Sequence, residues 1–129
     1  MKTIIIGAIL FLATNSIGLS QNIIYIYHDA GVSQQAYMQT KKTFEMLFKK
    51  RNIQPINACQ VKMGLWRNNA LLFIMPGGAD IPYVKKLHGK GDLQIKAYLK
   101  NGGSFIGICA GAYYASSHII FDPGGPLEI

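Results

Sequence analysis

Two short runs in this chain are apolar on both faces of the strand that each would form, and they constrain the fold most. A strand is also expected at 104–108 (SFIGI). The two runs are residues 23–27 (IIYIY) and 70–75 (ALLFIM). Such runs are typical of central strands in a parallel sheet that helices cover on both faces. A further strand is expected at 53–58, and Pro55 favours an edge position for it because proline cannot donate to a ladder.

Helical patterns separate these strands. Ser33 is a suitable N-cap for a helix whose apolar residues recur at helical spacing from Tyr37 to Phe48. Further helices are expected at 82–87, 92–100 and 110–117, and a connection with at most one helical turn at 60–69. The alternation predicts an α/β fold, a three-layer sandwich with a mostly parallel sheet of about four or five strands. Residues 119–121 and 127–129 are candidates for short strands near the end of the sequence.

The first twenty residues have the three-part pattern of a secretory signal peptide. Lys2 gives a positive start, residues 4–13 (IIIGAILFLA) are apolar, and residues 14–20 are small or polar. The apolar run is shorter than the about 20 residues that a spanning helix needs. We therefore expect cleavage before Gln21, an exported domain at 21–129 in the periplasm or outside the cell, and no stable membrane span after cleavage.

Charge and cysteine content exclude several classes of site. The net charge of +7 would fall to +6 without Lys2, and the basic residues are scattered rather than gathered in the patch that a nucleic-acid site needs. No pair of cysteine or histidine residues has zinc-site spacing, so no metal and no cofactor are expected. Cys59 is expected near the end of the edge strand, too far from Cys109 to predict a disulfide.

Cys109 lies in a G-x-C-x-G segment directly between an expected strand and an expected helix. This is the setting of a nucleophile elbow, a turn so tight that Gly107, Ala110 and Gly111 must be small. The positive end of the following helix would favour the thiolate form of the sulfur. The alternative is a small buried cysteine that serves packing only.

A second loop, PGGAD at 76–80, ends the preceding strand. Ligands bind at the carboxyl edge of open parallel sheets, and the backbone N–H groups of Gly77 and Gly78 could face a developing oxyanion there. Asp80, Tyr83 and Ala110 are further candidates for this site. An ordinary turn is an equally good interpretation of the loop considered alone.

Other candidate side chains follow from the expected topology. His28 and Asp29 end the first strand, so they are expected at the same sheet edge as Cys109, as a base or as pocket lining, although a backbone-capping role fits equally well. Tyr113 lies one helical turn after Cys109 and would share its face. His88 is expected to be exposed, and His118 is expected to face away from Cys109.

Three segments together resemble the biotin–protein ligase N-terminal domain family: PGGADIPY, NGGSFIGICAGAYYAS and FDPGGPLEI. The resemblance extends from Ile23 to Ile129. It implies a flavodoxin-like sheet within the class I glutamine amidotransferase-like superfamily, with Cys109 at the nucleophile position and Gly77 and Gly78 in the oxyanion loop. It does not imply biotin transfer, because the sequence holds no GRGR-type nucleotide loop. Active amidotransferases of the superfamily place a His and a Glu far downstream of the cysteine, and no such pair follows here.

Two function classes remain open on the sequence alone. The first is a cysteine-dependent hydrolase or transferase that acts on an amide or another acyl group, and the second is a non-catalytic module that binds a small molecule or a protein. The reactivity of Cys109 as a thiolate would distinguish these two classes. A last strand with an exposed edge also predicts a homodimer.

Overall fold

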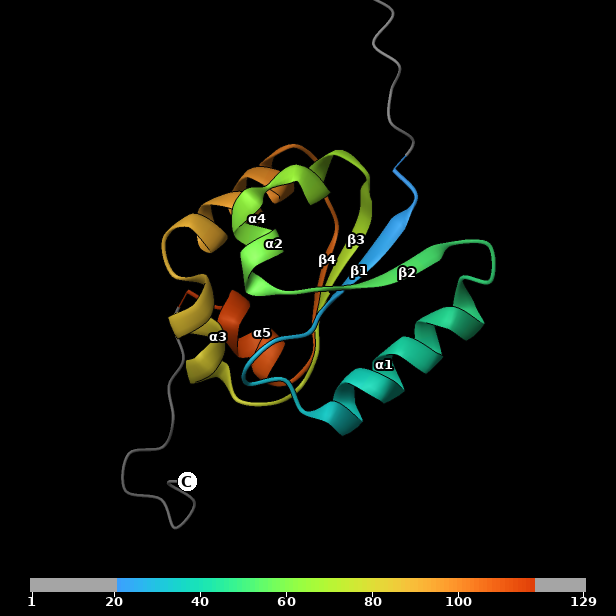
Figure 1. Cartoon of the computed structure of the whole chain (residues 1–129), viewed down its shortest axis with the longest axis horizontal. Coiled ribbons are helices and arrows are strands. Elements are labelled where there is room, and N and C mark those ends of the chain that lie inside the picture. Colours follow the sequence, from blue (N-terminus) through green and yellow to red (C-terminus); the bar gives the residue numbers. More distant parts are fainter. Residues whose placement is uncertain (1–20, 118–129) are drawn as a thin grey trace, which may run out of the picture.

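The computed structural model describes residues 21–117 and shows four strands and five α-helices arranged as a layered α/β domain (Figure 1). The strands are β1 (Ile23–Tyr27), β2 (Asn52–Ile56), β3 (Ala70–Met75) and β4 (Phe105–Gly107). The helices are α1 (Gln34–Leu47), α2 (Ala58–Met63), α3 (Asp80–Leu87), α4 (Lys90–Lys100) and α5 (Ala110–Ala115), with a 3₁₀ turn, η1 (Leu65–Asn68). The signal-peptide prediction, His118 and the predicted strands at 119–121 and 127–129 lie outside the described residues.

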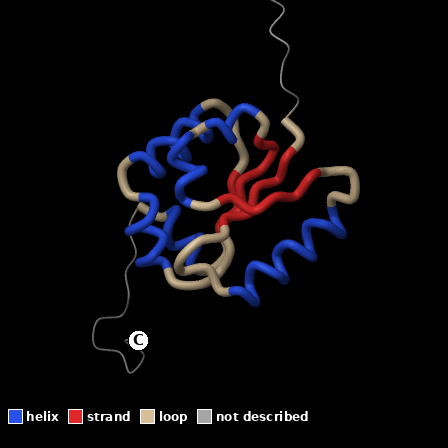
Figure 2. Tube along the Cα trace, in the orientation of Figure 1, coloured by secondary structure: helices blue, strands red, loops and turns tan. Residues whose placement is uncertain are grey.

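The four strands form one sheet in the order β2-β1-β3-β4, and every neighbouring pair is parallel (Figure 2). The predicted flavodoxin-like α/β sandwich is therefore confirmed. Pro55 pairs with Ile26 on the outermost strand, as expected for a residue without a backbone N–H. Because the strands are parallel, the loops after β1, β3 and β4 all leave the same edge of the sheet.

Helices cover both faces of this sheet, and each face has its own core (Figure 1). On one face, Tyr37 of α1 packs with Ile24, Ile26 and Ile74. The opposite face carries α2 to α5, and its larger core includes Tyr27, Phe73, Trp66, Tyr83, Tyr98 and Ala110. Alternate residues of each central strand supply the two cores, which explains why these strands are apolar throughout.

The structure corrects the prediction for residues 58–69. Ala58 begins α2 rather than ending a strand, and a 3₁₀ turn follows this helix. Asn57 and Gln60 form a capping box, and Gly64 ends α2 in the left-handed conformation with φ +77°. The sequence of this segment shows no periodic apolar face, because α2 and the 3₁₀ turn are both too short for one.

The remaining boundaries differ from the predicted ones by a few residues at element ends. Gly102 has φ +86° just after α4, as expected of a glycine that ends a helix. Within residues 21–117, no helix has the length and apolar character required to cross a bilayer.

Candidate functional site

Cys109 lies on the turn between β4 and α5, and its backbone is strained. Its φ is +51° and its ψ is −114°, and it is the one non-glycine residue with positive φ in the described part of the chain. A hydrogen bond holds the turn against the sheet: the N–H of Ile108 donates to the carbonyl of Met75 at 2.9 Å. The thiol is free and exposed, as is that of Cys59.

The glycines on either side of this turn are required by close backbone contacts. A Cβ at Gly107 would lie 2.6 Å from the carbonyl oxygen of Gly111, and a Cβ at Gly111 would lie 2.2 Å from the carbonyl oxygen of Met75. Real Cβ atoms do not approach backbone oxygens so closely. Ala110, which follows Cys109, is only 2 % exposed and faces the larger core. Small residues are therefore needed at all three positions, as the sequence predicted.

The loop after β3 lies directly against Cys109. A Cβ at Gly77 would lie 3.5 Å from Cβ of Cys109 and 3.6 Å from Cβ of Ala36 in α1. The same loop is joined to the loop after β1, because Ser33 donates its N–H to the carbonyl of Gly77 at 3.0 Å. Ala36 and Ser33 are neighbours of the site that the sequence did not identify as such, and the helix-capping signal of Ser33 was the only available hint.

Gly78 lies where the loops after β1 and β3 are closest. A Cβ at Gly78 would lie 2.0 Å from the carbonyl oxygen of Gly31, whereas one at Gly77 would make ordinary contacts. Ala79 donates its N–H to that same carbonyl at 2.8 Å. Only glycine fits at 78 without displacing one of the two loops.

Three backbone N–H groups near Cys109 have no acceptor among the residues that the structure describes. Those of Gly77, Gly78 and Ala110 donate no hydrogen bond to any residue within 21–117. Gly77 and Ala110 are buried, where N–H donors normally find a partner, whereas Gly78 is exposed. The two buried donors beside an exposed thiol therefore leave room for a ligand atom with lone pairs.

Tyr83 lies beneath the loop rather than at the wall of an open pocket. Its ring is fully buried, and its hydroxyl lies 3.0 Å from the carbonyl oxygen of Pro76 and 3.3 Å from that of Gly77. Burial, and then the negative charge that Cys109 can carry, raise the pKa of Tyr83 to about 12. The hydroxyl therefore stays protonated and acts as a donor across the physiological range.

His28 and Asp29 lie at the expected sheet edge, and both have local partners. The ring of His28 stacks on Tyr37 with centroids 4.0 Å apart, and its Nε2 lies 3.1 Å from Oε1 of Gln34. Asp29 accepts from the N–H of Ala58 at 2.9 Å, so it caps the start of α2.

Asp29 also accepts from the N–H of Ala30 at 2.6 Å, and its Oδ1 lies 3.7 Å from Nζ of Lys86. Burial alone would raise the pKa of Asp29. The N–H groups of Ala58 and Ala30, together with Lys86, lower this pKa below its ordinary value. The contacts are those of a structural carboxylate.

The other predicted residues are Asp80, Tyr113 and His88, and of these Tyr113 donates its N–H to the carbonyl of Cys109 at 3.1 Å. Asp80 accepts from the N–H of Ile81 at 3.0 Å, within the first turn of its own helix. Tyr113 is 44 % exposed on α5. His88 is exposed, as predicted, and its Nδ1 lies 3.6 Å from a carboxylate oxygen of Asp92.

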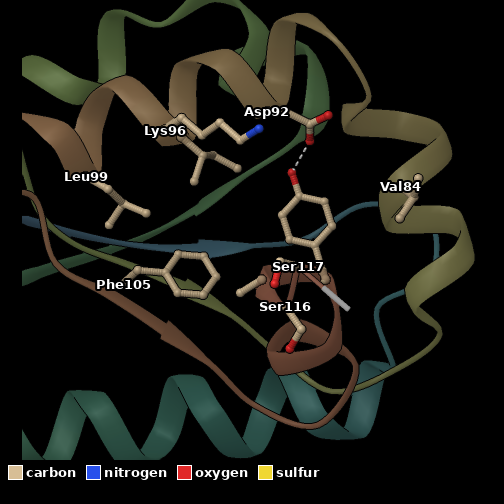
Figure 3. A pocket seen from close by; sticks show the side chains of 10 residues that line it. Val84, Asp92, Lys96, Leu99, Phe105, Ser116 and Ser117 are labelled. Atoms are coloured by element: carbon tan, nitrogen blue, oxygen red, sulfur yellow. Dashed lines mark hydrogen bonds between the residues drawn. The ribbon is translucent and has the colours of Figure 1, made fainter. Parts of the chain in front are cut away.

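A separate cavity of about 380 Å³ lies between α3, α4, β4 and α5 (Figure 3). Its wall is largely apolar, with Val84, Leu99 and Phe105 facing it, and Asp92 accepts a hydrogen bond from Tyr114 there. Cys109 does not line this cavity. No group of three metal-ligating side chains occurs within the described range.

Residues 22–129 match the family described as "Biotin-protein ligase, N terminal". An uncharacterized protein of Chlamydia muridarum is 35% identical over 110 residues, which are 82% of this chain and 42% of that protein. A biotin–protein ligase of Schizosaccharomyces pombe is 25% identical over 99 residues, which are 76% of this chain and 16% of the ligase. The chain thus spans less than half the length of either relative. Because the family match covers nearly all of the sequence, the chain belongs to the biotin–protein ligase N-terminal family.

Proposed function

We propose that this family member uses Cys109 as a nucleophile on an amide or a related acyl group. The observation that carries the proposal is the strained backbone of Cys109 beside backbone N–H groups that have no acceptor within residues 21–117. Strain of this kind costs on the order of 1–3 kcal/mol and is concentrated at active sites. A cysteine that served packing alone would need neither an exposed thiol nor this conformation.

The proposed step is an acyl transfer to sulfur. The Cys109 thiolate attacks the carbonyl carbon, a carbon–sulfur bond forms, and the π pair moves onto oxygen. The N–H groups of Gly77, Gly78 and Ala110 hold that oxyanion. When the carbonyl re-forms, the carbon–nitrogen bond breaks and the leaving amine takes up a proton from water. Water or another nucleophile then cleaves the thioester.

The relatives do not extend this proposal to biotin. The Schizosaccharomyces pombe protein is a biotin–protein ligase as a whole, and the present chain matches 16% of it. We therefore propose no biotin transfer for this chain. Assignment to the class I glutamine amidotransferase-like superfamily is part of the same proposal and rests on the strand–Cys109–helix arrangement.

A non-catalytic binding module is the second candidate, and the position of His28 favours it. A cysteine nucleophile is usually paired with a general base. Within the described residues, the ring of His28 is already stacked on Tyr37 and bonded to Gln34. His28→Ala tests the base role: loss of acylation at Cys109 would assign His28 as the base, and an unchanged rate would leave it a structural role.

The direct test is formation of an acyl-enzyme from p-nitrophenyl acetate. We expect a burst of p-nitrophenolate and an acetyl group on Cys109 by mass spectrometry, both abolished in Cys109→Ser and retained in Cys59→Ser. Cys59 is a matched control because it too is exposed and lies in the first turn of a helix, α2. Equal acetylation of the two thiols would contradict the proposal.

Export and dimerisation are also proposed. Among the described strands, β4 lies at an edge of the sheet, and this edge is the surface that a second copy would cover. Sedimentation of a monodisperse monomer would contradict dimerisation, and an intact N-terminus on protein recovered from the producing cells would contradict cleavage before Gln21.

A further inference from the structure

We propose that Tyr83 is a positioning residue that sets the direction of the N–H groups in the Gly77–Gly78 loop; this inference rests on the proposed acyl transfer at Cys109. Tyr83 is the first buried residue of α3, the helix that directly follows the loop. Its hydroxyl reaches back to the carbonyl oxygens of Pro76 and Gly77 at 3.0 and 3.3 Å. One side chain therefore contacts two consecutive peptide groups.

Because a peptide group is planar, a contact that fixes the direction of its carbonyl also fixes the direction of its N–H. All described peptide bonds are trans, so the N–H of each points opposite to its C=O. With the carbonyls of Pro76 and Gly77 turned toward the Tyr83 hydroxyl, the N–H groups of Gly77 and Gly78 are turned away from it. They keep no acceptor among residues 21–117, so the orientation is not maintained by bonds of their own.

Other contacts fix the position of the loop but only part of its orientation. The N–H of Ser33 also binds the carbonyl of Gly77, and Ala79 binds that of Gly31. The carbonyl of Pro76, in contrast, accepts from Tyr83 and from no other donor within the described part of the chain. Glycines have wide backbone freedom. Without the hydroxyl, the peptide that joins Pro76 and Gly77 is free to rotate.

The position of Tyr83 relative to Cys109 fits this role. The charge of Cys109 contributes to the raised pKa of Tyr83, so the two groups are close enough to interact electrostatically. The hydroxyl is nonetheless fully buried, which excludes it from direct contact with a substrate. Tyr83 acts through the loop and not on the reacting atoms.

The test compares two reactions of the same thiol. Acylation by p-nitrophenyl acetate develops an oxyanion, whereas alkylation by iodoacetamide does not, so the ratio of the two rates at Cys109 reports on the loop donors alone. We expect Tyr83→Phe to lower this ratio about ten-fold, less than the about 10²- to 10³-fold that follows from loss of an oxyanion donor. The alkylation rate should stay within about two-fold.

Tyr98→Phe is the matched control. Tyr98 is also buried, and its hydroxyl accepts from the N–H of Ser104 at 3.1 Å, but Ser104 precedes β4 whereas Cys109 follows it. Tyr98→Phe should therefore leave the ratio unchanged. Tyr83→Met, which fills the same core space without a hydroxyl, repeats the test should Tyr83→Phe not fold.

Each outcome has a distinct meaning. An unchanged ratio in Tyr83→Phe, with wild-type acylation still selective for Cys109, overturns the role of Tyr83 and leaves the proposed function intact. An equal fall in Tyr98→Phe also overturns it, because loss of any buried hydroxyl would then suffice. Wild-type protein that acetylates Cys109 and Cys59 equally overturns the proposed function itself.

Discussion

The loop after β1 and the loops after β3 and β4 leave the same edge of the sheet. They differ in whether their polar groups have hydrogen-bond partners. After β1, Asp29 receives two backbone N–H groups and lies near Lys86, and His28 is bonded to Gln34. After β3 and β4, the N–H groups beside Cys109 have no acceptor within the described residues. In the loop after β1, the polar groups bind other parts of the protein and hold helices in place. In the loops after β3 and β4, the N–H groups beside Cys109 are available to a ligand.

The comparison shows that position at a sheet edge does not by itself identify a functional residue. Parallel topology brings His28, Asp29 and Cys109 to one edge. What separates them is whether each polar group already has a partner. The substitutions below test that separation, from the largest expected effect to the smallest.

The largest effect is expected from Gly78→Ala. The new Cβ would lie 2.0 Å from the carbonyl oxygen of Gly31, so one of the two loops must move. We expect a loss of about 3 kcal/mol in the free energy of unfolding, measured in urea. Gly77→Ala is the control, because its Cβ makes ordinary contacts, and it should change stability by less than about 1 kcal/mol. Equal losses in both variants would contradict the described packing of the loops.

A smaller effect is expected from Asp29→Ala. Loss of the Asp29 bond to the first N–H of α2 should lower the free energy of unfolding by about 1 kcal/mol, with the exposed partner Lys86 adding little. Alkylation of Cys109 should stay within about two-fold of the wild-type rate. A large fall in that rate with unchanged stability would assign Asp29 to the site and remove the contrast between the two regions.

Acid titration gives the smallest effect and sharpens the assignment of Asp29. Because its pKa is lowered in the folded protein, the carboxylate contributes stability above its unfolded pKa of about 3.9, and this contribution is lost as pH falls through the folded value. The stability advantage of wild type over Asp29→Asn should therefore be constant near neutral pH and shrink below about pH 4. An advantage that grew on acidification would contradict the lowered pKa.

Much of this fold could be predicted because the two central strands, β1 and β3, are buried on both faces. The runs at 23–27 and 70–75 match β1 and β3, and Pro55 correctly indicated an edge strand. Residues 58–69 could not be predicted, since α2 and η1 are each too short for a periodic pattern and depend on the local Asn57–Gln60 capping box.

The site was predictable in outline and not in its contacts. Glycines around Cys109 indicated a tight turn, and the distances at Gly107 and Gly111 show the backbone crowding behind that pattern. No sequence signal showed that Asp29 caps α2 or that the Tyr83 hydroxyl reaches the loop. Such contacts depend on how loops from distant parts of the chain meet, which residue types alone do not encode.

The most direct test of the account is the rate at which iodoacetamide labels Cys109 and Cys59 at neutral pH, measured by mass spectrometry in native and in urea-unfolded protein. Both thiols are exposed, so access alone should not separate them. We predict that Cys109 is labelled at least about ten-fold faster than Cys59 in the native protein and at an equal rate when unfolded. Equal or slower labelling of native Cys109 would contradict the claim that the strained turn serves a reactive nucleophile.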